Sequence, residues 1–369
     1  MRGLAMLGLA GLAQAGLQAP EPDEHAWDGL RLDQVQMIGT HNSYHQRPDE
    51  ALLALLRNGK LGDGPAWPGP RLARATDYGH EPLAAQLDRG VRALELDIRD
   101  DPQGGLYVHP PFLDTLAING AQPDARWDPS GVMRAPGFKT IHKPAYDPRS
   151  NCPLFADCLT EIAGWSKAHP DHLPIVLMIE VKNAEHPRPG CAGLCDDGWR
   201  RLKLALTEAF GSTLLAPNGV GSKWPTLGSI RGRVIVMLLD EEEHARSYRA
   251  ETDRDGDDII FTAARPAKNA PLRAGPHDRI AILPNPADPR IVDARRMGML
   301  VYTRADADTE EARANDTRRR DLAFRSGATF IATDYPNSDP RFSSYSVRFG
   351  SGFVRCDPQS GPALCQGQP

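Results

Sequence analysis

A short apolar run ends in a polar histidine–asparagine pair in the stretch Ile38-Gly39-Thr40-His41-Asn42-Ser43-Tyr44. The run begins at Val35, and this pattern is typical of a strand that ends at one edge of a sheet. A histidine can transfer protons near neutral pH, and an amide oxygen is a hard ligand for a cation. We therefore expect a functional site where this strand ends.

Similar apolar runs with polar ends recur along the chain, and helical patterns lie between them. Strands are predicted at Val35–Ile38, Val91–Ile98, Phe138–Ile141, Ile175–Val181, Val234–Leu239, Ile280–Leu283, Met299–Tyr302 and Thr329–Ala332, and helices near Pro82–Arg89, Phe155–Ala168, Gly198–Phe210 and Glu310–Ser326. Such alternation is typical of a parallel α/β fold. About eight strands favour a TIM-type (β/α)8 barrel, regular or irregular, over an open doubly wound sheet. No G-x-G-x-x-G motif follows the first strand, so a dinucleotide site has no support.

One domain with long loops is the expected organisation. We predict that the barrel spans residues 28–345, and that a tail at 346–369 is pinned by a disulfide bond. Long loops are expected at 58–77, 103–137 and 183–197. In a parallel barrel, the loops that follow the strands build the site.

The first residues are interpreted as a signal peptide. Arg2 precedes the apolar segment Leu4–Leu12, and Ala13-Gln14-Ala15 is a small-x-small cleavage pattern. Cleavage is expected after Ala15, so the protein is expected to be secreted or periplasmic; a disordered or helical N-terminus is the alternative. We expect no transmembrane segment, because no later run is long and apolar enough.

The six cysteines form three close pairs in the sequence: Cys152/Cys158, Cys191/Cys195 and Cys356/Cys365. In an oxidising compartment, neighbouring cysteines suggest local disulfide bonds that pin loops. Zinc is the rival interpretation, since Cys191 and Cys195 have a permissible ligand spacing, but zinc normally recruits four cysteine or histidine ligands.

The formal net charge of −5 argues against a nucleic-acid-binding protein. The densest basic stretch, Arg318-Arg319-Arg320, is short and lies near acidic residues, so it is expected to be a solvated helix face. Attraction to an anionic membrane would have to be local or supplied by a bound cation.

Four residues form a candidate set of oxygen ligands: Asn42, Glu95, Asp97 and Glu180. Glu95 and Asp97 are two positions apart on one predicted strand and therefore project from the same face. Carboxylates within apolar runs are costly to bury unless a cation or hydrogen bonds compensate their charge. The set suits a hard ion, Ca²⁺ before Mg²⁺. The alternative is a structural salt-bridge network with Arg92, Arg99 and Lys182.

Two histidines follow predicted strands, His41 after the first and His142 after the third. Beside a divalent cation, a pair of histidines suggests cleavage of a phosphate ester, one stabilising the attack and the other protonating the leaving group. His109 competes with His142 for the second role, although the prolines after it suggest a surface loop. We interpret the other histidines, His45 and His80 among them, as incidental.

Several motifs around these residues resemble one known family. They are Thr40-His41-Asn42-Ser43-Tyr44, Leu94-Glu95-Leu96-Asp97, Gly137-Phe138-Lys139-Thr140-Ile141-His142, Ile179-Glu180-Val181-Lys182, Thr303-Arg304-Ala305-Asp306 and Ala332-Thr333-Asp334-Tyr335. Together they resemble the calcium-dependent phosphatidylinositol-specific phospholipase C family, above all its small secreted bacterial members. The similarity runs from about Val35 to Tyr335.

That resemblance implies a phosphodiesterase barrel with catalytic Ca²⁺ held by Asn42, Glu95, Asp97 and Glu180. His41 would stabilise the phosphorane and His142 would protonate the departing diacylglycerol oxygen. A metal-bound carboxylate, Glu180 or Glu95, would deprotonate the inositol 2-hydroxyl.

The resemblance also makes Lys182 and Arg304 contacts for phosphate or inositol, with Asp306 orienting Arg304. The substrate would be a phospholipid met transiently at a membrane surface by a monomeric protein. One departure stands out: Lys143-Pro144-Ala145-Tyr146-Asp147 follows His142, where the family leads us to expect a more acidic segment.

Two other functions remain open. A glycerophosphodiester phosphodiesterase shares the barrel and the acidic cluster, but such enzymes usually begin with a His-Arg pair, whereas this chain has His41-Asn42. A catalytically inactive, calcium-dependent protein that binds lipid head groups is the second alternative.

Overall fold

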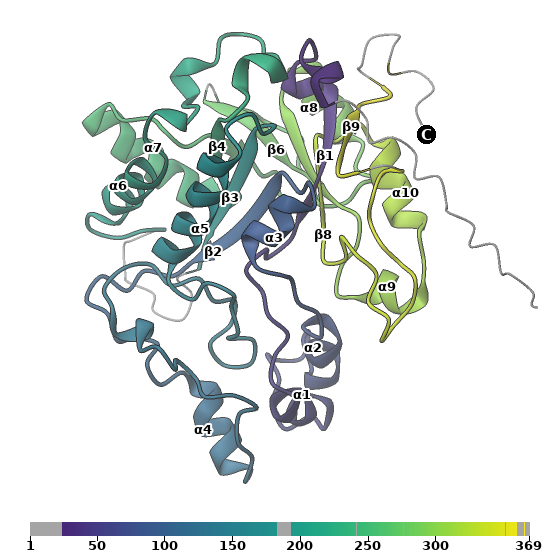
Figure 1. Ribbon diagram of the computed structural model, residues 1–369. Helices are drawn as coiled ribbons and strands as arrows, with labels where there is room; N and C mark the ends of the chain where they lie inside the picture. Colours follow the sequence, from purple (N-terminus) through teal and green to yellow (C-terminus); the bar gives the residue numbers. More distant parts are fainter. Residues whose placement is uncertain are drawn as a thin grey trace, which may run out of the picture.

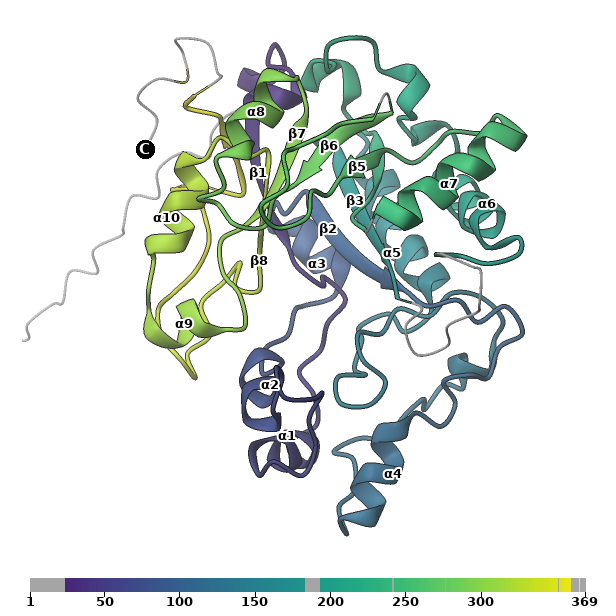
Figure 2. The same ribbon diagram turned by 180° about the vertical axis from the view of Figure 1, so that it is seen from behind.

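The computed structural model describes residues 24–182, 193–240, 242–275, 277–350, 352–359 and 365. The predicted signal peptide at 1–15 lies outside the described residues, as does most of the predicted loop at 183–197. Figures 1 and 2 show a sheet curled into a barrel with helices packed around it.

The sheet has nine strands in the part of the chain that the structure describes. The strands are β1 (Val35–Thr40), β2 (Ala93–Ile98), β3 (Ile175–Val181), β4 (Val234–Leu238), β5 (Thr262–Ala264), β6 (Asp278–Ile282), β7 (Leu300–Arg304), β8 (Phe330–Thr333) and β9 (Val354–Cys356). Eight of them are parallel neighbours in the order β4-β3-β2-β1-β8-β7-β6-β5. A parallel bridge between Met237 and Phe261 joins β4 to the residues just before β5. The predicted TIM-type barrel is therefore confirmed.

The last strand, β9, was not predicted. It pairs antiparallel with the first half of β1, where Val35 faces Cys356 and Met37 faces Val354. The second half of β1 pairs with β2, and Gly39 faces Ala93 there. A Cβ atom on Gly39 would lie 2.7 Å from the Ala93 carbonyl oxygen, so a glycine lets these two strands approach each other.

Alternation along the strands places side chains on two faces. In β2, Leu94, Leu96 and Ile98 pack in the cluster shared with the outer helices, whereas Ala93 packs in the barrel interior. Glu95 and Asp97 have the parity of Ala93 and therefore point into the barrel. Buried strands with apolar residues on both faces, such as β3, are typical of parallel sheets.

The helices mostly cover the outside of the barrel. They are α1 (Glu50–Arg57), α2 (Gly69–Ala75), α3 (Leu83–Asp88), α4 (Pro111–Ile118), α5 (Phe155–Ala168), α6 (Gly198–Phe210), α7 (Glu242–Asp255), α8 (Arg290–Arg296), α9 (Glu310–Ala314) and α10 (Arg318–Arg325). Short 3-10 helices lie at Glu24–Trp27, Leu32–Gln34, Val132–Arg134, Gly211–Thr213, Pro217–Gly219 and Leu227–Ile230. Figure 1 shows α1, α2 and α4 extending away from the barrel at one end. They belong to the long loops after β1 and β2.

The predicted strand at Phe138–Ile141 is wrong. This segment makes only isolated bridges, from Lys139 to Arg99 and to Leu154. Lys139 is fully buried and lies 3.1 Å from Asp101, so the segment folds back against the end of β2. The eighth barrel strand is instead β5, whose three residues carry no apolar run that the sequence pattern could reveal.

The predicted helix at Glu310–Ser326 is two helices, α9 and α10. Asn315 ends α9 in the left-handed region with φ 51°, a conformation that asparagine tolerates better than most residues. The predicted helices α5 and α6 have the predicted bounds. In α6, buried Trp199, Leu202 and Leu206 recur at helical spacing, which is why periodicity found it.

Two predicted cysteine pairs are disulfide bonds, Cys152–Cys158 and Cys356–Cys365. The third pair includes Cys191, which lies outside the described residues. Among the helices described, none combines the length and the apolar character that a membrane-spanning segment requires.

Candidate active site

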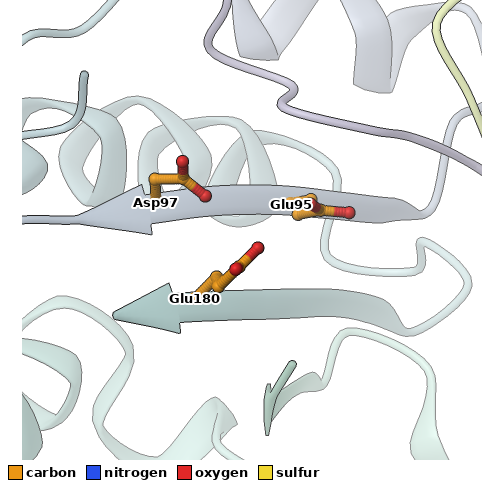
Figure 3. A group of neighbouring side chains, drawn as sticks. All are labelled: Glu95, Asp97 and Glu180. Carbon is orange, nitrogen blue, oxygen red and sulfur yellow. The ribbon is translucent and has the colours of Figure 1, made fainter. Parts of the chain in front are cut away.

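Three carboxylates meet inside the barrel, two of them buried and one partly buried. Glu95 and Asp97 come from β2 and Glu180 comes from β3, and each residue offers an oxygen within 4.8 Å of the others. Figure 3 shows Glu95 and Asp97 on one strand and Glu180 on the next. The register explains the meeting, because Asp97 lies directly beside Glu180 in the parallel pair. Three of the four predicted cation ligands are thus brought together.

Burial and mutual repulsion raise the pKa values of two of these carboxyl groups. Glu95 is 1% exposed, and burial, followed by the charges of Glu180 and Asp97, raises its pKa to about 8. Burial also raises the pKa of Asp97, against the attraction of Lys182. A cation in this position would favour the ionised carboxylates and so offset the effects of burial and repulsion on both pKa values.

Glu180 behaves differently because a lysine neutralises it. Its carboxyl group is desolvated, but the Lys182 charge and hydrogen bond outweigh burial and lower its pKa. The Lys182 ammonium lies 2.5 Å from Glu180 and 3.8 Å from Asp97. The single positive charge of Lys182 therefore lies beside two carboxylates, and the cluster keeps an excess of negative charge.

The donor set fits Ca²⁺. Neither carboxylate oxygen of buried Asp97 makes a hydrogen bond of good geometry, although such groups are costly to bury unsatisfied. Glu95 accepts a hydrogen bond from Tyr302 and Glu180 pairs with Lys182, so Asp97 alone of the three has both oxygens unbonded. Carboxylate oxygens are the ligands that a hard divalent cation takes.

Asn42, the fourth predicted ligand, lies in the turn that follows β1. Its φ of 48° is left-handed, and the turn is held because the Ser43 backbone N–H donates to the Glu95 carbonyl oxygen. The Asn42 amide nitrogen donates to the Tyr78 hydroxyl at 3.2 Å. Its amide oxygen is then the atom left to serve as a ligand.

His41 lies beside this cluster and is held by Asp334, at the end of β8. His41 Nδ1 donates to Asp334 at 2.7 Å, and Nε2 lies 3.7 Å from Glu95 and 3.3 Å from an Arg304 nitrogen. Burial, and then the Arg304 charge, lowers the pKa of His41 to about 4. The imidazole is therefore neutral at pH 7, with its proton on Nδ1.

His142 lies on the loop after β2 and is held through both its side chain and its backbone. Nδ1 donates to Asp147 at 2.6 Å. The fully buried Arg99 donates to the carbonyl oxygens of Ile141 and His142. These contacts with Asp147 and Arg99, and not a strand as predicted, hold His142 in place.

Both histidines line one cavity of about 330 Å³. Asn42, Asp147, Arg304 and Asp334 line it too. Most of its remaining lining residues come from the long loops after β1 and β2, among them Trp67, Tyr78, Lys143 and Tyr146. The predicted pair of histidines is thus assembled at one opening of the barrel.

His109 is not part of this cavity. Its side chain is 64% exposed and lies close to Asp114, on the long loop that carries α4. Among the described residues, His142 therefore has the position required of the second histidine.

The partner of Arg304 differs from the prediction. Arg304 donates to Asp334 at 3.1 Å, whereas Asp306 accepts hydrogen bonds from Thr333, from the Asp334 backbone and from Tyr345. Asp306 is fully buried and braces the turn after β8. The carboxylate that orients Arg304 is thus Asp334, and Asp306 supports Asp334 from behind.

The sequence patterns gave no role to three residues of the site. Asp334 belonged to a recognised motif, and Asp147 closed the atypical segment after His142. His45 was interpreted as incidental, yet it is fully buried and donates to Asp147 at 2.6 Å. Nothing in the sequence around His45, four residues after His41, indicated that its side chain would be buried.

Comparison with known proteins identifies relatives. Residues 30–358 match the family described as phosphoinositide phospholipase C, Ca²⁺-dependent. No curated protein sequence matches the chain.

The similar solved structures include two bacterial enzymes. A calcium-dependent phosphoinositol-specific phospholipase C from Pseudomonas sp., a Gram-negative bacterium, is 14% identical with a TM-score of 0.55, over 90% of this chain and 97% of that chain. A Ca²⁺-dependent phosphatidylinositol-specific enzyme from Streptomyces antibioticus is 18% identical with a TM-score of 0.45, over 82% of this chain and 94% of that chain. At this identity the Pseudomonas structure supports the barrel fold.

Proposed function

This chain belongs to the Ca²⁺-dependent phosphoinositide phospholipase C family, and on that premise we propose that it cleaves the glycerol–phosphate bond of phosphatidylinositol or a related phospholipid. The family consists of phosphodiesterases, so the chain is an enzyme of this class. The finer assignment concerns the residues that carry out the reaction and the cation they hold.

One observation carries the proposal. His41 and His142 line the same cavity, and each donates from Nδ1 to its own aspartate, Asp334 or Asp147. In both residues Nε2 is then the nitrogen left to exchange protons with a bound phosphodiester. Two histidines with this arrangement, beside an acidic cluster, are suited to in-line displacement at phosphorus.

The cation of the reaction would be Ca²⁺, held by Asn42, Glu95, Asp97 and Glu180. When bound, it supplies positive charge that stabilises the phosphoryl oxygens and makes an inositol hydroxyl more acidic. The free oxygens of Asp97 and the raised pKa of Glu95 support this proposal.

The remaining roles follow from position and charge. Glu95 or Glu180 accepts the proton of the inositol 2-hydroxyl as its oxygen attacks phosphorus. Arg304 donates hydrogen bonds to the phosphoryl oxygens as charge develops there. His41, whose Nε2 lies 3.3 Å from an Arg304 nitrogen, donates from Nε2 once that nitrogen has taken up a proton. His142 donates a proton to the diacylglycerol oxygen as its bond to phosphorus breaks, and Lys182 holds Glu180 in place.

A product assay tests the function. Purified protein is incubated with mixed phospholipid vesicles, with Ca²⁺ or with excess EGTA, and the products are identified by mass spectrometry. We expect diacylglycerol and an inositol phosphate, cyclic or hydrolysed, only with Ca²⁺. Glycerol 3-phosphate would instead indicate a glycerophosphodiester phosphodiesterase. Head-group binding without any product would indicate an inactive binding protein, and full activity in EGTA would exclude the Ca²⁺ role.

The setting of this reaction is also a proposal. The predicted signal peptide and the disulfide bonds Cys152–Cys158 and Cys356–Cys365 support action outside the cytoplasm. A monomer that meets its lipid transiently at a membrane surface is consistent with such a secreted enzyme.

A further inference from the structure

One buried carboxylate is shared by two histidines beside the cavity. Asp147 is 1% exposed; its Oδ2 accepts from His142 Nδ1 and its Oδ1 accepts from His45 Nε2, both at 2.6 Å. Burial alone would raise the pKa of Asp147, but His45 and His142 outweigh burial and lower it. The carboxylate is therefore ionised, and each of its oxygens has an N–H donor.

This arrangement determines the tautomers of both rings. An ionised carboxylate can only accept, so His142 carries a proton on Nδ1 and His45 carries one on Nε2. His45 Nδ1 has no hydrogen-bond partner in its buried position, as expected for the unprotonated nitrogen of a neutral ring. His142 thus keeps Nε2 for the cavity.

His45 is itself held on the side away from Asp147. Its ring stacks on Tyr78, with ring centroids 4.2 Å apart and planes inclined by 19°. The Tyr78 hydroxyl accepts from the Asn42 amide. A continuous set of contacts therefore runs from the proposed cation ligand Asn42, through Tyr78 and His45, to Asp147 and His142.

We propose that Asp147 and His45 are positioning residues that hold His142 as the proton donor to an alcohol leaving group. This inference rests on the function proposed above. An alkoxide is a poor leaving group and needs a proton as the bond to phosphorus breaks, so His142, in its imidazolium form, must present Nε2–H to that oxygen. Asp147 fixes the ring and stabilises its protonated form, and His45 prevents Asp147 from turning away.

Three variants separate positioning from simple packing. Asp147→Asn keeps the size of the side chain but places one amide N–H₂ against a ring nitrogen. His45→Phe keeps a ring to stack on Tyr78 but removes the donor to Asp147. His45→Gln keeps an N–H donor and loses the ring.

The measurement uses two water-soluble esters of myo-inositol 1-phosphate, one of butanol and one of 4-nitrophenol. Nitrophenolate leaves without a proton, so its release does not depend on His142. We expect Asp147→Asn to lower kcat for the butyl ester by about 100-fold or more, within the range of positioned proton transfer. His45→Phe should lower it less, by about 10-fold, because Asp147 and His142 both remain. On the nitrophenyl ester both variants stay close to wild type, and His45→Gln recovers most of the butyl-ester rate.

Asp114→Asn is the matched control. Asp114 also pairs with a histidine, His109, but the pair is exposed on the loop that carries α4. Both ester rates should match those of wild type. Equal loss on the two esters in Asp147→Asn and His45→Phe, or no loss, would overturn the positioning role.

If the variants do not fold, ring ¹⁵N NMR of the wild-type protein decides the proposal. His142 protonated on Nδ1 and His45 protonated on Nε2 support it, and the opposite tautomer of neutral His142 overturns it. Wild-type protein that cleaves neither ester would mean that the proposed function itself has failed.

Discussion

The loop between β2 and α5 carries two histidine–aspartate pairs with the same spacing in the sequence. His109 lies 2.8 Å from Asp114, and His142 lies 2.6 Å from Asp147; in both pairs the aspartate comes five residues later. Their surroundings differ. The side chains of the first pair are 64% and 65% exposed, whereas those of the second are 25% and 1% exposed.

Burial therefore distinguishes the two pairs, whereas their spacing in the sequence does not. Water and salt screen the exposed pair, and exposed pairs contribute little free energy. The buried pair is screened less, and Asp147 has a second donor in His45 that fixes its orientation. The backbone of His142 is held by Arg99 as well. Four predictions follow from this contrast, in decreasing order of effect.

Replacing each histidine by alanine should give the largest difference. His142→Ala should lower kcat on phosphatidylinositol by about 10²- to 10⁴-fold, because a positioned proton donor is lost. His109→Ala should leave kcat at the wild-type value. Kinetics on vesicles with Ca²⁺ measure both. A large loss in His109→Ala alone would assign the acid role to that residue and reverse the comparison.

Stabilisation of the folded protein by Ca²⁺ should depend on a buried carboxylate of the site and not on an exposed carboxylate. At a Ca²⁺ concentration about 100 times its Kd, the folded protein should gain about 2.7 kcal/mol. Asp97→Asn should lose most of this gain, because it removes a buried ligand with two free oxygens. Asp114→Asn should keep it. Thermal unfolding during Ca²⁺ titration measures the gain, and an unchanged shift in Asp97→Asn would contradict the proposed site.

His172 extends the comparison to a buried histidine without a carboxylate partner. It bonds the Ser166 hydroxyl and the Leu173 carbonyl oxygen, and burial lowers its pKa below the usual histidine value of 6.5. Below about pH 6.5 the unfolded chain takes up a proton at this position before the folded protein does, so stability falls as pH falls.

His172→Gln should remove this contribution. The difference in free energy of unfolding between wild type and variant should be constant above pH 7.5. As pH falls to 5, wild type should lose free energy of unfolding relative to the variant. Urea unfolding at each pH measures it. A difference that stays constant over the whole range would show that His172 binds protons alike in both states.

The smallest effect is expected at the exposed pair. Asp114→Asn should change the free energy of unfolding by less than about 1 kcal/mol, since the pair is exposed and screened. Urea unfolding at low and high salt tests this. A larger cost that persists in high salt would mean that the pair has a structural role that its exposure does not suggest.

Local pattern predicted much of the fold. The bounds of β3, α5 and α6 followed from apolar runs and helical spacing. Phe138–Ile141 failed because an apolar run cannot reveal that Lys139 will bury its charge against Asp101. Strand β5 was missed because Thr262–Ala264 is short and only weakly apolar.

Local pattern likewise predicted some residues of the site and missed others. Alternation along strands was enough to bring Glu95 and Asp97 to one face, and the parallel register then placed Glu180 beside them. The aspartates that hold the two histidines could not be assigned. Asp334 is 293 positions from His41, and only closure of the barrel between β1 and β8 brings them together.

The sequence by itself determined the kind of fold, the acidic cluster and the two histidines, because these depend on periods of two and 3.6 residues and on the residues that follow each strand. Only the tertiary structure decided which histidine faces the cavity, which carboxylate orients Arg304, and that Asp147 serves both His142 and His45. These choices depend on burial and on contacts between distant segments. The same five-residue spacing therefore joins His142 to a buried aspartate and His109 to an exposed one.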